Sequence, residues 1–225
     1  MKTWMEAFIR RMRQAFGDRL AFVGLQGSRA RGEATPKSDI DVVVVLDRLE
    51  ADDIGAYRAA LEELPEREKI CGFFSGRAEL AAWERSDLFQ FVHDTIPFYG
   101  DLSAITPPLS REDARRAALT GVCNIYHGCV HNLLFERDAD VLYGLYKTAG
   151  FALRAKHFWQ TGAYVSKTDE LAGMLPEGEA RLLTERDDVE ALVADGEALE
   201  EFSRILFAWA GETIRVLGGV NANDT

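Results

Sequence analysis

The feature that most constrains the fold is the stretch DIDVVVVLD at residues 39–47. Its four consecutive valines are β-branched, so the stretch predicts a buried β-strand. Alternate side chains of a strand share a face. We therefore expect Asp39 and Asp41 on one face, and we expect the other face to point into the core with Ile40, Val42 and Val44. Two carboxylates roughly 6–7 Å apart on one strand face repel each other unless a cation lies between them. The stretch thus predicts a core strand that begins at a cation-binding site.

The first hundred residues contain further strand and helix patterns. Apolar side chains at helical spacing predict a helix over residues 4–16, and acids in a first turn favour another over residues 51–64. Besides 39–47, strands are predicted over residues 19–26, 68–75 and 94–101, and the proline in the last one indicates a sheet edge. We expect an α+β fold in which a small mixed β-sheet is flanked by helices.

The composition changes at residues 103–110, where two prolines in a short polar stretch indicate a linker. No strand pattern recurs beyond it. Helices are predicted over residues 110–137, 138–162, 168–175 and 195–217. The expected organisation is a first domain over residues 1–105, followed by an all-α helical bundle domain over residues 110–218.

The chain of 225 residues is acidic, with a formal net charge of −11. Both halves share this character: 14 Lys and Arg stand against 18 Asp and Glu up to residue 105, and 12 against 19 after it. Nucleic-acid binders held by phosphate contacts need a basic face, so we expect no nucleic-acid partner. An acidic field suits a cationic small substrate or a metal site. The first sixteen residues are too charged for a signal peptide and too short for a membrane span, so we expect a cytoplasmic protein with no membrane partner.

A glycine-serine turn, Gly27-Ser28, directly follows the strand predicted over residues 19–26. Glycine lets the backbone approach a ligand closely, so the amides of Ser28 and Arg29 would face phosphate oxygens. Arg29 or Arg31 can add a planar charged fork. Beside the two carboxylates, Mg²⁺ is the natural ion because it takes hard oxygen ligands and is usually completed by substrate phosphates. These residues indicate a nucleoside triphosphate–metal site and phosphoryl or nucleotidyl transfer.

The stretch GSRARGEATPKSDIDVVVV, residues 27–45, resembles the signature of the polymerase-β-like nucleotidyltransferase superfamily. An arginine after Gly-Ser, followed by Ser-Asp-Ile-Asp, is most similar to the minimal and antibiotic-modifying nucleotidyltransferases. In the second half, LYKTAGFALRAKHFWQTGAYVSKTDELAGMLP at residues 145–176 is similar to the C-terminal helical domain of kanamycin- and streptomycin-type nucleotidyltransferases and to HEPN helical bundles.

The resemblance implies a role for each matched position. Asp39 and Asp41 would bind the metal ions, which implies a two-metal Mg²⁺ site and a catalytic role for both. The triphosphate of ATP or another nucleoside triphosphate would be bound by Gly27, Ser28, Arg29 or Arg31, and Lys147.

The family usually carries a third carboxylate on the strand that follows the intervening helix, where it completes the metal site or acts as general base. Here that strand reads EKICGFFS, residues 68–75, and the expected acid falls near Cys71, Gly72 or Phe73. Two hypotheses follow. In one, the enzyme is active and its catalytic base is Glu68 or an acid of the helical domain, namely Glu136, Asp138 or Asp140. In the other, the two-acid site binds nucleotide and metal without transfer chemistry.

The expected reaction is Mg²⁺-dependent transfer of a nucleoside monophosphate to a hydroxyl of a small molecule, such as an aminoglycoside-like compound, or of a protein. The alternative is a catalytically quiet nucleotide-binding or interaction module related to toxin–antitoxin pairs. A homodimer is one candidate assembly. Separately, Cys123, His127 and His131 stand four residues apart on one predicted helix, which suits either a zinc-binding stripe or a packed helix face.

Overall fold

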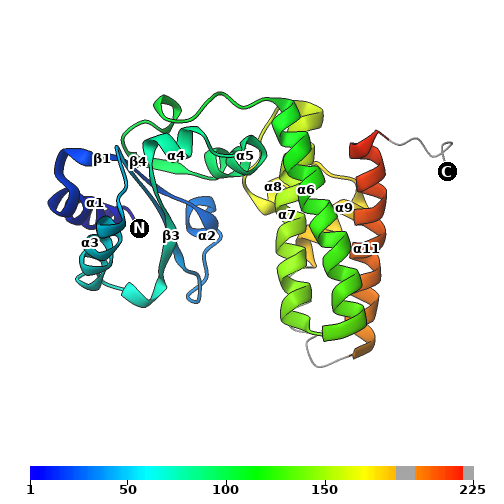
Figure 1. Cartoon of the computed structure of the whole chain (residues 1–225). Helices are drawn as coiled ribbons and strands as arrows, with labels where there is room; N and C mark the ends of the chain where they lie inside the picture. Colours follow the sequence, from blue (N-terminus) through cyan, green and yellow to red (C-terminus); the bar gives the residue numbers. More distant parts are fainter. Residues whose placement is uncertain (186–195, 220–225) are drawn as a thin grey trace. The chain divides into compact units, whose positions relative to one another are not determined.

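The structure is a computed structural model that describes residues 1–185 and 196–219 (Figure 1). In it, the valine run forms an inner strand of a four-stranded sheet. The strands are β1 Leu20–Leu25, β2 Ile40–Leu46, β3 Ile70–Gly76 and β4 Ile96–Tyr99, in the order β3-β2-β1-β4. β1 runs antiparallel to β2 and β4, whereas β2 and β3 are parallel. The expected mixed sheet is confirmed, and β4 lies at an edge.

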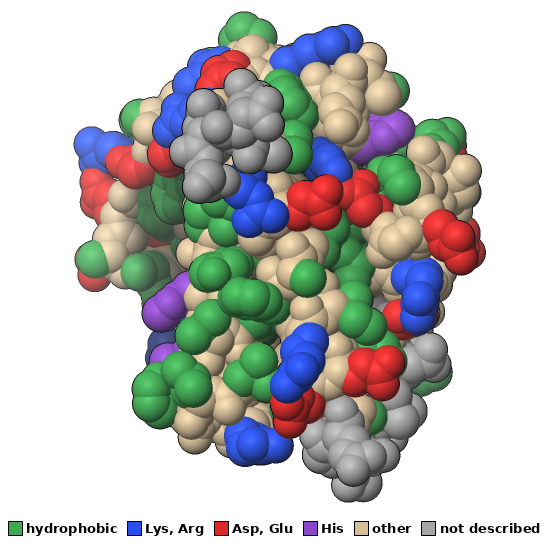
Figure 2. Space-filling model, turned by 90° about the vertical axis from the view of Figure 1, so that its right-hand side faces the viewer, with side chains coloured by type: hydrophobic (Ala, Val, Ile, Leu, Met, Phe, Trp, Pro, Cys, Tyr) green, Lys and Arg blue, Asp and Glu red, His purple; other side chains and the backbone are tan. Residues whose placement is uncertain are grey.

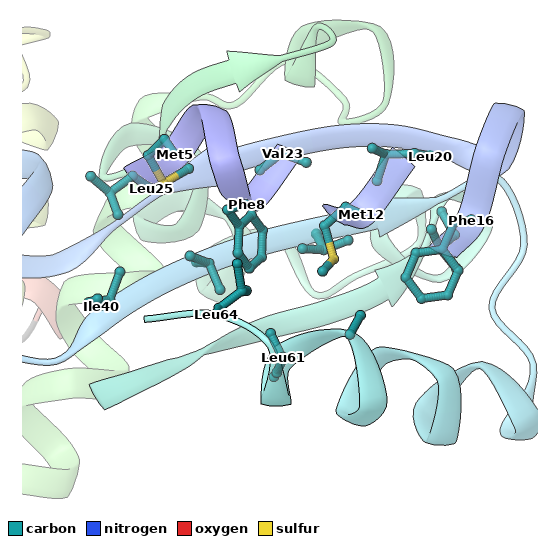
Figure 3. Close-up of a cluster of buried hydrophobic side chains, with 14 residues drawn as sticks. Met5, Phe8, Met12, Phe16, Leu20, Val23, Leu25, Ile40, Leu61 and Leu64 are labelled. Carbon is teal, nitrogen blue, oxygen red and sulfur yellow. The ribbon is translucent and has the colours of Figure 1, made fainter. Parts of the chain in front are cut away.

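One face of the sheet is covered by α1 Lys2–Phe16 and α3 Ala51–Glu62. Figure 3 shows the apolar side chains of α1 lying over those of the strands, with Leu61 and Leu64 closing the cluster from below. Ile40, Val42 and Val44 belong to this core, as the alternation predicted. Each such fully buried side chain stabilises the fold by roughly 1.5–3 kcal/mol. The apolar side chains that recur at helical spacing along α1 therefore hold this helix on the sheet.

The opposite face of β2 is buried as well, since Val43 and Val45 have no exposed surface. Gly24 pairs with Val43, and a Cβ placed on Gly24 would lie 2.5 Å from the Thr95 side chain. The chain after α5 Arg85–His93 therefore packs on this side of the sheet. Burial on both faces explains why valine fills four consecutive positions.

Several elements differ from the expectations. Gly27-Ser28 opens a short helix, α2 Gly27–Arg31. Glu68 lies in a 3-10 turn, η2 Arg67–Lys69, which follows Glu66 in the left-handed conformation, so β3 begins only at Ile70. The pattern did not reveal α4 Arg77–Ala81, α5 Arg85–His93 or α9 Glu177–Thr184, which are all short. A 3-10 turn, η3 Leu102–Ala104, and an extended stretch lead to Pro108, where the first of two structural units ends.

The second unit, Leu109–Thr225, contains the expected helices and no strand among its described residues. α6 Arg111–His131 begins at a capping box of Ser110 and Asp113 and continues into a π-helical turn, η4 Asn132–Glu136. α7 Ala139–Thr161 ends at Gly162 in the left-handed conformation. α8 Thr168–Ala172 is shorter than expected, and α11 Gly196–Gly218 covers the last predicted helix except residue 195, which lies outside the described residues.

α6 packs against both α7 and α11, around a core that includes Ile125, Leu142, Tyr146 and Leu206. This apolar core is separate from the core of the first unit. Within residues 1–185 and 196–219, none of the helices combines the length and the apolar character that a membrane span requires.

Candidate active site

The Gly27-Ser28 segment and the Asp39–Asp41 segment meet at one end of the β1–β2 pair. The Gln26 amide donates a 2.8 Å hydrogen bond to the Asp41 carbonyl, which joins the end of β1 to the start of β2. Gly27 has φ +70°, and a Cβ placed on it would lie 2.0 Å from Oδ2 of Asp41. The backbone at Gly27 is therefore in direct contact with the Asp41 carboxylate, and any larger residue would displace it. The structure brings these two predicted site residues together.

Ser28 and the residues that follow it form the first turn of α2, after Gln26 in extended conformation. The first amides of a helix have no acceptor within the helix, so they are available to a ligand. Ser28 is half-buried and adds a hydroxyl donor to this turn. Backbone amides beside a carboxylate pair can bind phosphate oxygens while the carboxylates bind a cation.

The structure gives Arg29 a positioning role. Its Nε donates to the carbonyl of Asp39 at 2.9 Å, and its Nη2 donates to the carbonyl of Ser38 at 2.9 Å. Two charge-assisted bonds to consecutive carbonyls hold the backbone immediately before β2. Arg29 therefore connects α2 to the segment that presents Asp39. Its expected contact with phosphate stays a prediction.

Arg31 lies deeper, with 12 % of its side chain exposed. Its Nε donates to Glu33 at 2.9 Å, and its Nη1 lies 3.9 Å from Oδ2 of the buried Asp94. These contacts join α2 to the C-terminal end of α5. The expected contact of Arg31 with phosphate also stays a prediction, as does the role of Lys147, which is exposed on α7 with its Nζ 5.8 Å from the centre of the Tyr143 ring.

On the side of β2 away from β1, the residue paired with Asp41 comes from β3. In the parallel β2–β3 pair, Asp41 is in register with Cys71, so the two side chains share a face of the sheet. Cys71 is exposed, and Gly72 is required at φ +141° because a Cβ there would lie 1.9 Å from the Val42 carbonyl oxygen. The position where a third carboxylate would complete the site therefore carries a thiol.

The alternative acids lie elsewhere. Glu68 is exposed in η2, ahead of β3. In the helical unit, Asp138 caps α7 through the amides of Asp140 and Val141, and Glu136 lies 3.5 Å from His131. The role of each as a base stays a prediction. Glu68 and Cys71 are both exposed, and both come before the buried end of β3 at Ser75 and Gly76.

The residues present fit a magnesium site of the kind that substrate phosphates complete. Asp41 is half-buried and Asp39 is exposed one residue before β2, so both offer hard oxygen ligands at the surface. No group of three His, Cys, Asp or Glu able to hold a metal ion occurs in the described parts of the chain. The candidate protein ligands at this edge are therefore the two aspartates.

Sequence reasoning missed the contribution of Gln26 and its neighbours. The Gln26 side-chain amide donates to the Phe91 carbonyl at 3.1 Å and to Thr95 Oγ1 at 2.7 Å. Phe91 in turn contacts Phe73 edge-on, with ring centroids 4.8 Å apart. The Gln26 hydrogen bonds attach the end of β1 to α5 and to Thr95 just beyond it, and the ring contact attaches α5 to β3. Only the position of Gln26, immediately before Gly27, could have suggested its involvement.

Comparison with known proteins agrees with this geometry. Residues 5–82, which include Gly27, Ser28, Asp39 and Asp41, match the family model of the nucleotidyltransferase domain. No curated protein sequence matches the chain closely enough to be called a relative. Among solved structures, the chain is similar to the spectinomycin adenyltransferase AAD(9) from Enterococcus faecialis, crystallised with ATP and spectinomycin. The TM-score is 0.57 at 14 % sequence identity, over 93 % of this chain and 98 % of that chain.

The similarity extends over both units, so a nucleotidyltransferase domain followed by a helical region is a fold that this chain shares with a solved adenyltransferase. The nucleotidyltransferase domain expected from the Gly-Ser and Asp-Ile-Asp motifs is confirmed over residues 5–82. Residues 5–82 of this chain therefore form a nucleotidyltransferase domain, and the chain has a fold similar to that of a solved adenyltransferase.

Proposed function

We propose that this chain transfers a nucleoside monophosphate from ATP, or from another nucleoside triphosphate, to a hydroxyl of a small molecule and releases pyrophosphate. The observation that carries the proposal is the contact of Gly27 with the Asp41 carboxylate, since it joins a phosphate-binding turn to a cation-binding side chain. Nucleotidyl transfer needs these two features next to each other, because the reacting phosphate is bound by both at once.

The roles of the residues follow from their positions. Asp39 and Asp41 would hold Mg²⁺, which when bound neutralises charge that develops on the phosphates. Gly27 and the amides of the first turn of α2 would bind the triphosphate. Arg29 holds the carbonyls of Ser38 and Asp39, so it orients the first aspartate. Most of the catalysis then comes from positioning and charge neutralisation.

The acceptor we propose is a cationic small molecule of the aminoglycoside kind. The net charge of −11, shared by both halves of the chain, favours a cationic compound over a polyanion. The similar adenyltransferase was solved with spectinomycin, which makes that compound a sensible first probe. A hydroxyl of a protein side chain is the other acceptor to test.

A catalytically quiet nucleotide-binding module is the second candidate, and a specific observation favours it. Cys71 stands in register with Asp41 where a third carboxylate would activate the acceptor, and Glu68 lies outside the strand. General bases typically contribute a factor of about 10²–10⁴ to a rate, so a site without one would bind nucleotide and turn over slowly.

The experiment combines two measurements on the full chain. Binding of ATP is measured by calorimetry with and without Mg²⁺, and pyrophosphate release is measured with spectinomycin, streptomycin, kanamycin and a protein mixture as acceptors. Mg²⁺-dependent binding together with acceptor-dependent release supports the transferase. Binding without release supports the quiet module.

Matched variants test the site itself. We expect Asp41→Asn and Asp39→Asn to abolish Mg²⁺-dependent binding, because each removes a metal ligand. Asp52→Asn is the control, since Asp52 is an exposed aspartate on α3 with the same change in charge. Equal ATP affinity in all three variants would show that the site lies elsewhere.

A further inference from the structure

Two histidines lie one turn apart on α6, outside the nucleotide site. His127 and His131 are separated by four residues, and their ring centroids are 6.2 Å apart. Both side chains are exposed. Residues at this spacing are neighbours on a helix surface, so the two imidazoles project from the same face. The alternative of a packed helix face is not what the structure shows, because the buried side chains of α6 include Val122, Ile125 and Cys129 and not the histidines.

The spacing of the two rings suits a shared metal ion. Zinc binds imidazole nitrogen at about 2.0–2.1 Å, which places the centroids of two rings on one tetrahedral ion about 5 Å apart. The observed separation of 6.2 Å is about 1 Å larger. Exposed side chains change rotamer readily, so a small rotation of the two rings brings one nitrogen of each to a common ion.

Glu136 supplies the support that metal-binding histidines commonly have. Its Oε1 lies 3.5 Å from Nδ1 of His131, because the π-helical turn η4 carries Glu136 back toward the end of α6. Once the ring turns onto a metal ion, this carboxylate can accept a hydrogen bond from Nδ1 and leave Nε2 of His131 for the metal. The His131 ring also has the exposed Phe135 ring at 5.1 Å. In Figure 2, histidine side chains lie at the surface beside hydrophobic ones.

We propose that His127 and His131 together bind a divalent transition-metal ion of the Zn²⁺, Ni²⁺ or Cu²⁺ class, with His131 oriented by Glu136. Imidazole ligands favour these ions over Mg²⁺, which takes oxygen ligands. The site is therefore distinct in chemistry from the aspartate pair. Water fills the remaining coordination positions. Cys123, exposed one turn earlier on α6, is not needed for the two-histidine site.

The test is calorimetric titration of the full chain with Zn²⁺, in the background of Asp39→Asn with Asp41→Asn. This background removes the aspartate ligands of the nucleotide site, so failure of that site does not affect the result. We expect one equivalent of Zn²⁺ per chain with micromolar affinity. His127→Ala and His131→Ala should each weaken binding at least tenfold, and Glu136→Gln should weaken it several-fold.

Asn124→Ala is the matched control, because Asn124 is exposed on the same helix and carries no metal-binding side chain. Nuclear magnetic resonance of the four histidine rings gives a second readout: the signals of His127 and His131 should move with Zn²⁺, while those of His93 and His157 stay in place. The proposal is overturned by the absence of micromolar binding, by affinity that survives loss of both histidines, or by movement of the His93 or His157 signals instead.

Discussion

At the scale of single residues, the candidate site depends on two glycines and a cysteine as much as on its acids. Gly27 leaves room for the Asp41 carboxylate, and Gly72 leaves room for the Val42 carbonyl. Cys71, between that glycine and the start of β3, is the register neighbour of Asp41. The identity of these residues decides how closely α2, β2 and β3 approach one another.

Gly27→Ala should abolish nucleotide binding, because the new Cβ would overlap Oδ2 of Asp41. The positive φ adds strain of about 1–2 kcal/mol. Gly32→Ala is the control: Gly32 has φ +76° in the same segment, but a Cβ placed on it would have no atom within 4 Å. Calorimetric titration with Mg²⁺ and ATP, beside urea unfolding, separates the two effects. Similar loss of ATP affinity in both variants would contradict a specific role for the Gly27–Asp41 contact.

Cys71→Glu should increase the rate of transfer to a hydroxyl acceptor, because it places a carboxylate on the strand face that Asp41 occupies. The expected gain is at least about tenfold, set against the range of about 10²–10⁴ that general bases contribute. Cys123→Glu makes the same exchange at an exposed cysteine of the helical unit and serves as the control. An unchanged pyrophosphate release rate in Cys71→Glu would mean that another residue already supplies the base.

At the scale of elements, α3 is attached to the sheet by its first turn. Glu50 and Asp53 form a capping box, and Asp53 also accepts two hydrogen bonds from Arg19, at 2.9 and 2.7 Å. The Arg19 hydrogen bonds, followed by the backbone amide of Glu50, hold the pKa of Asp53 below its usual value. The helix start and the loop before β1 are thus joined through one carboxylate.

Asp53→Asn should lower the free energy of unfolding by about 1 kcal/mol at neutral pH, because it weakens the charge-assisted hydrogen bonds from Arg19 and the capping box with Glu50. Because the pKa of Asp53 is lower in the folded state, its contribution is present above the unfolded pKa near about 4 and is lost as the pH falls through the folded pKa. Urea unfolding at several pH values checks this. The difference between the two proteins should shrink below about pH 4, and a constant difference at all pH values would contradict the assignment.

At the scale of the whole molecule, the chain has two apolar cores, one in each unit. Gly27, Asp39, Asp41 and Cys71 all belong to the first unit, whereas the two histidines of the proposed metal site belong to the second. Ligands of the two sites should therefore stabilise different parts of the protein.

Mg²⁺ with ATP should slow amide hydrogen exchange mainly in residues 20–46, which carry β1, α2 and β2. A ligand at about a hundred times its Kd stabilises the folded state by about 2.7 kcal/mol. Zn²⁺ should instead slow exchange around the end of α6. Mass spectrometry of exchanged peptides measures both, and Asp41→Asn should remove the first effect while keeping the second. Slower exchange confined to the helical unit with ATP would contradict the proposed nucleotide site.

The strands and long helices follow from local patterns, and so they could be predicted. The alternation of Ile40, Val42 and Val44 indicated the core face of β2, and the spacing along α1 indicated its buried side. Ser110 and Asp113 marked the start of α6, and Gly162 marked the end of α7, whereas the end of α6 at His131 was not predicted. Short helices such as α4 and α9 were not predicted, because a helix of one or two turns contains too few apolar positions to show a period.

Residues close together along the chain were enough to predict the nucleotidyltransferase domain, the strand that carries the aspartates and the helical character of the second half. Three contacts could be found only in the folded structure: Gly27 lies against Asp41, Arg29 holds the backbone of Ser38 and Asp39, and Cys71 pairs with Asp41 across β2 and β3. These contacts depend on the register between strands and on the path of α2. Register is set by the packing of whole faces, which no local pattern specifies.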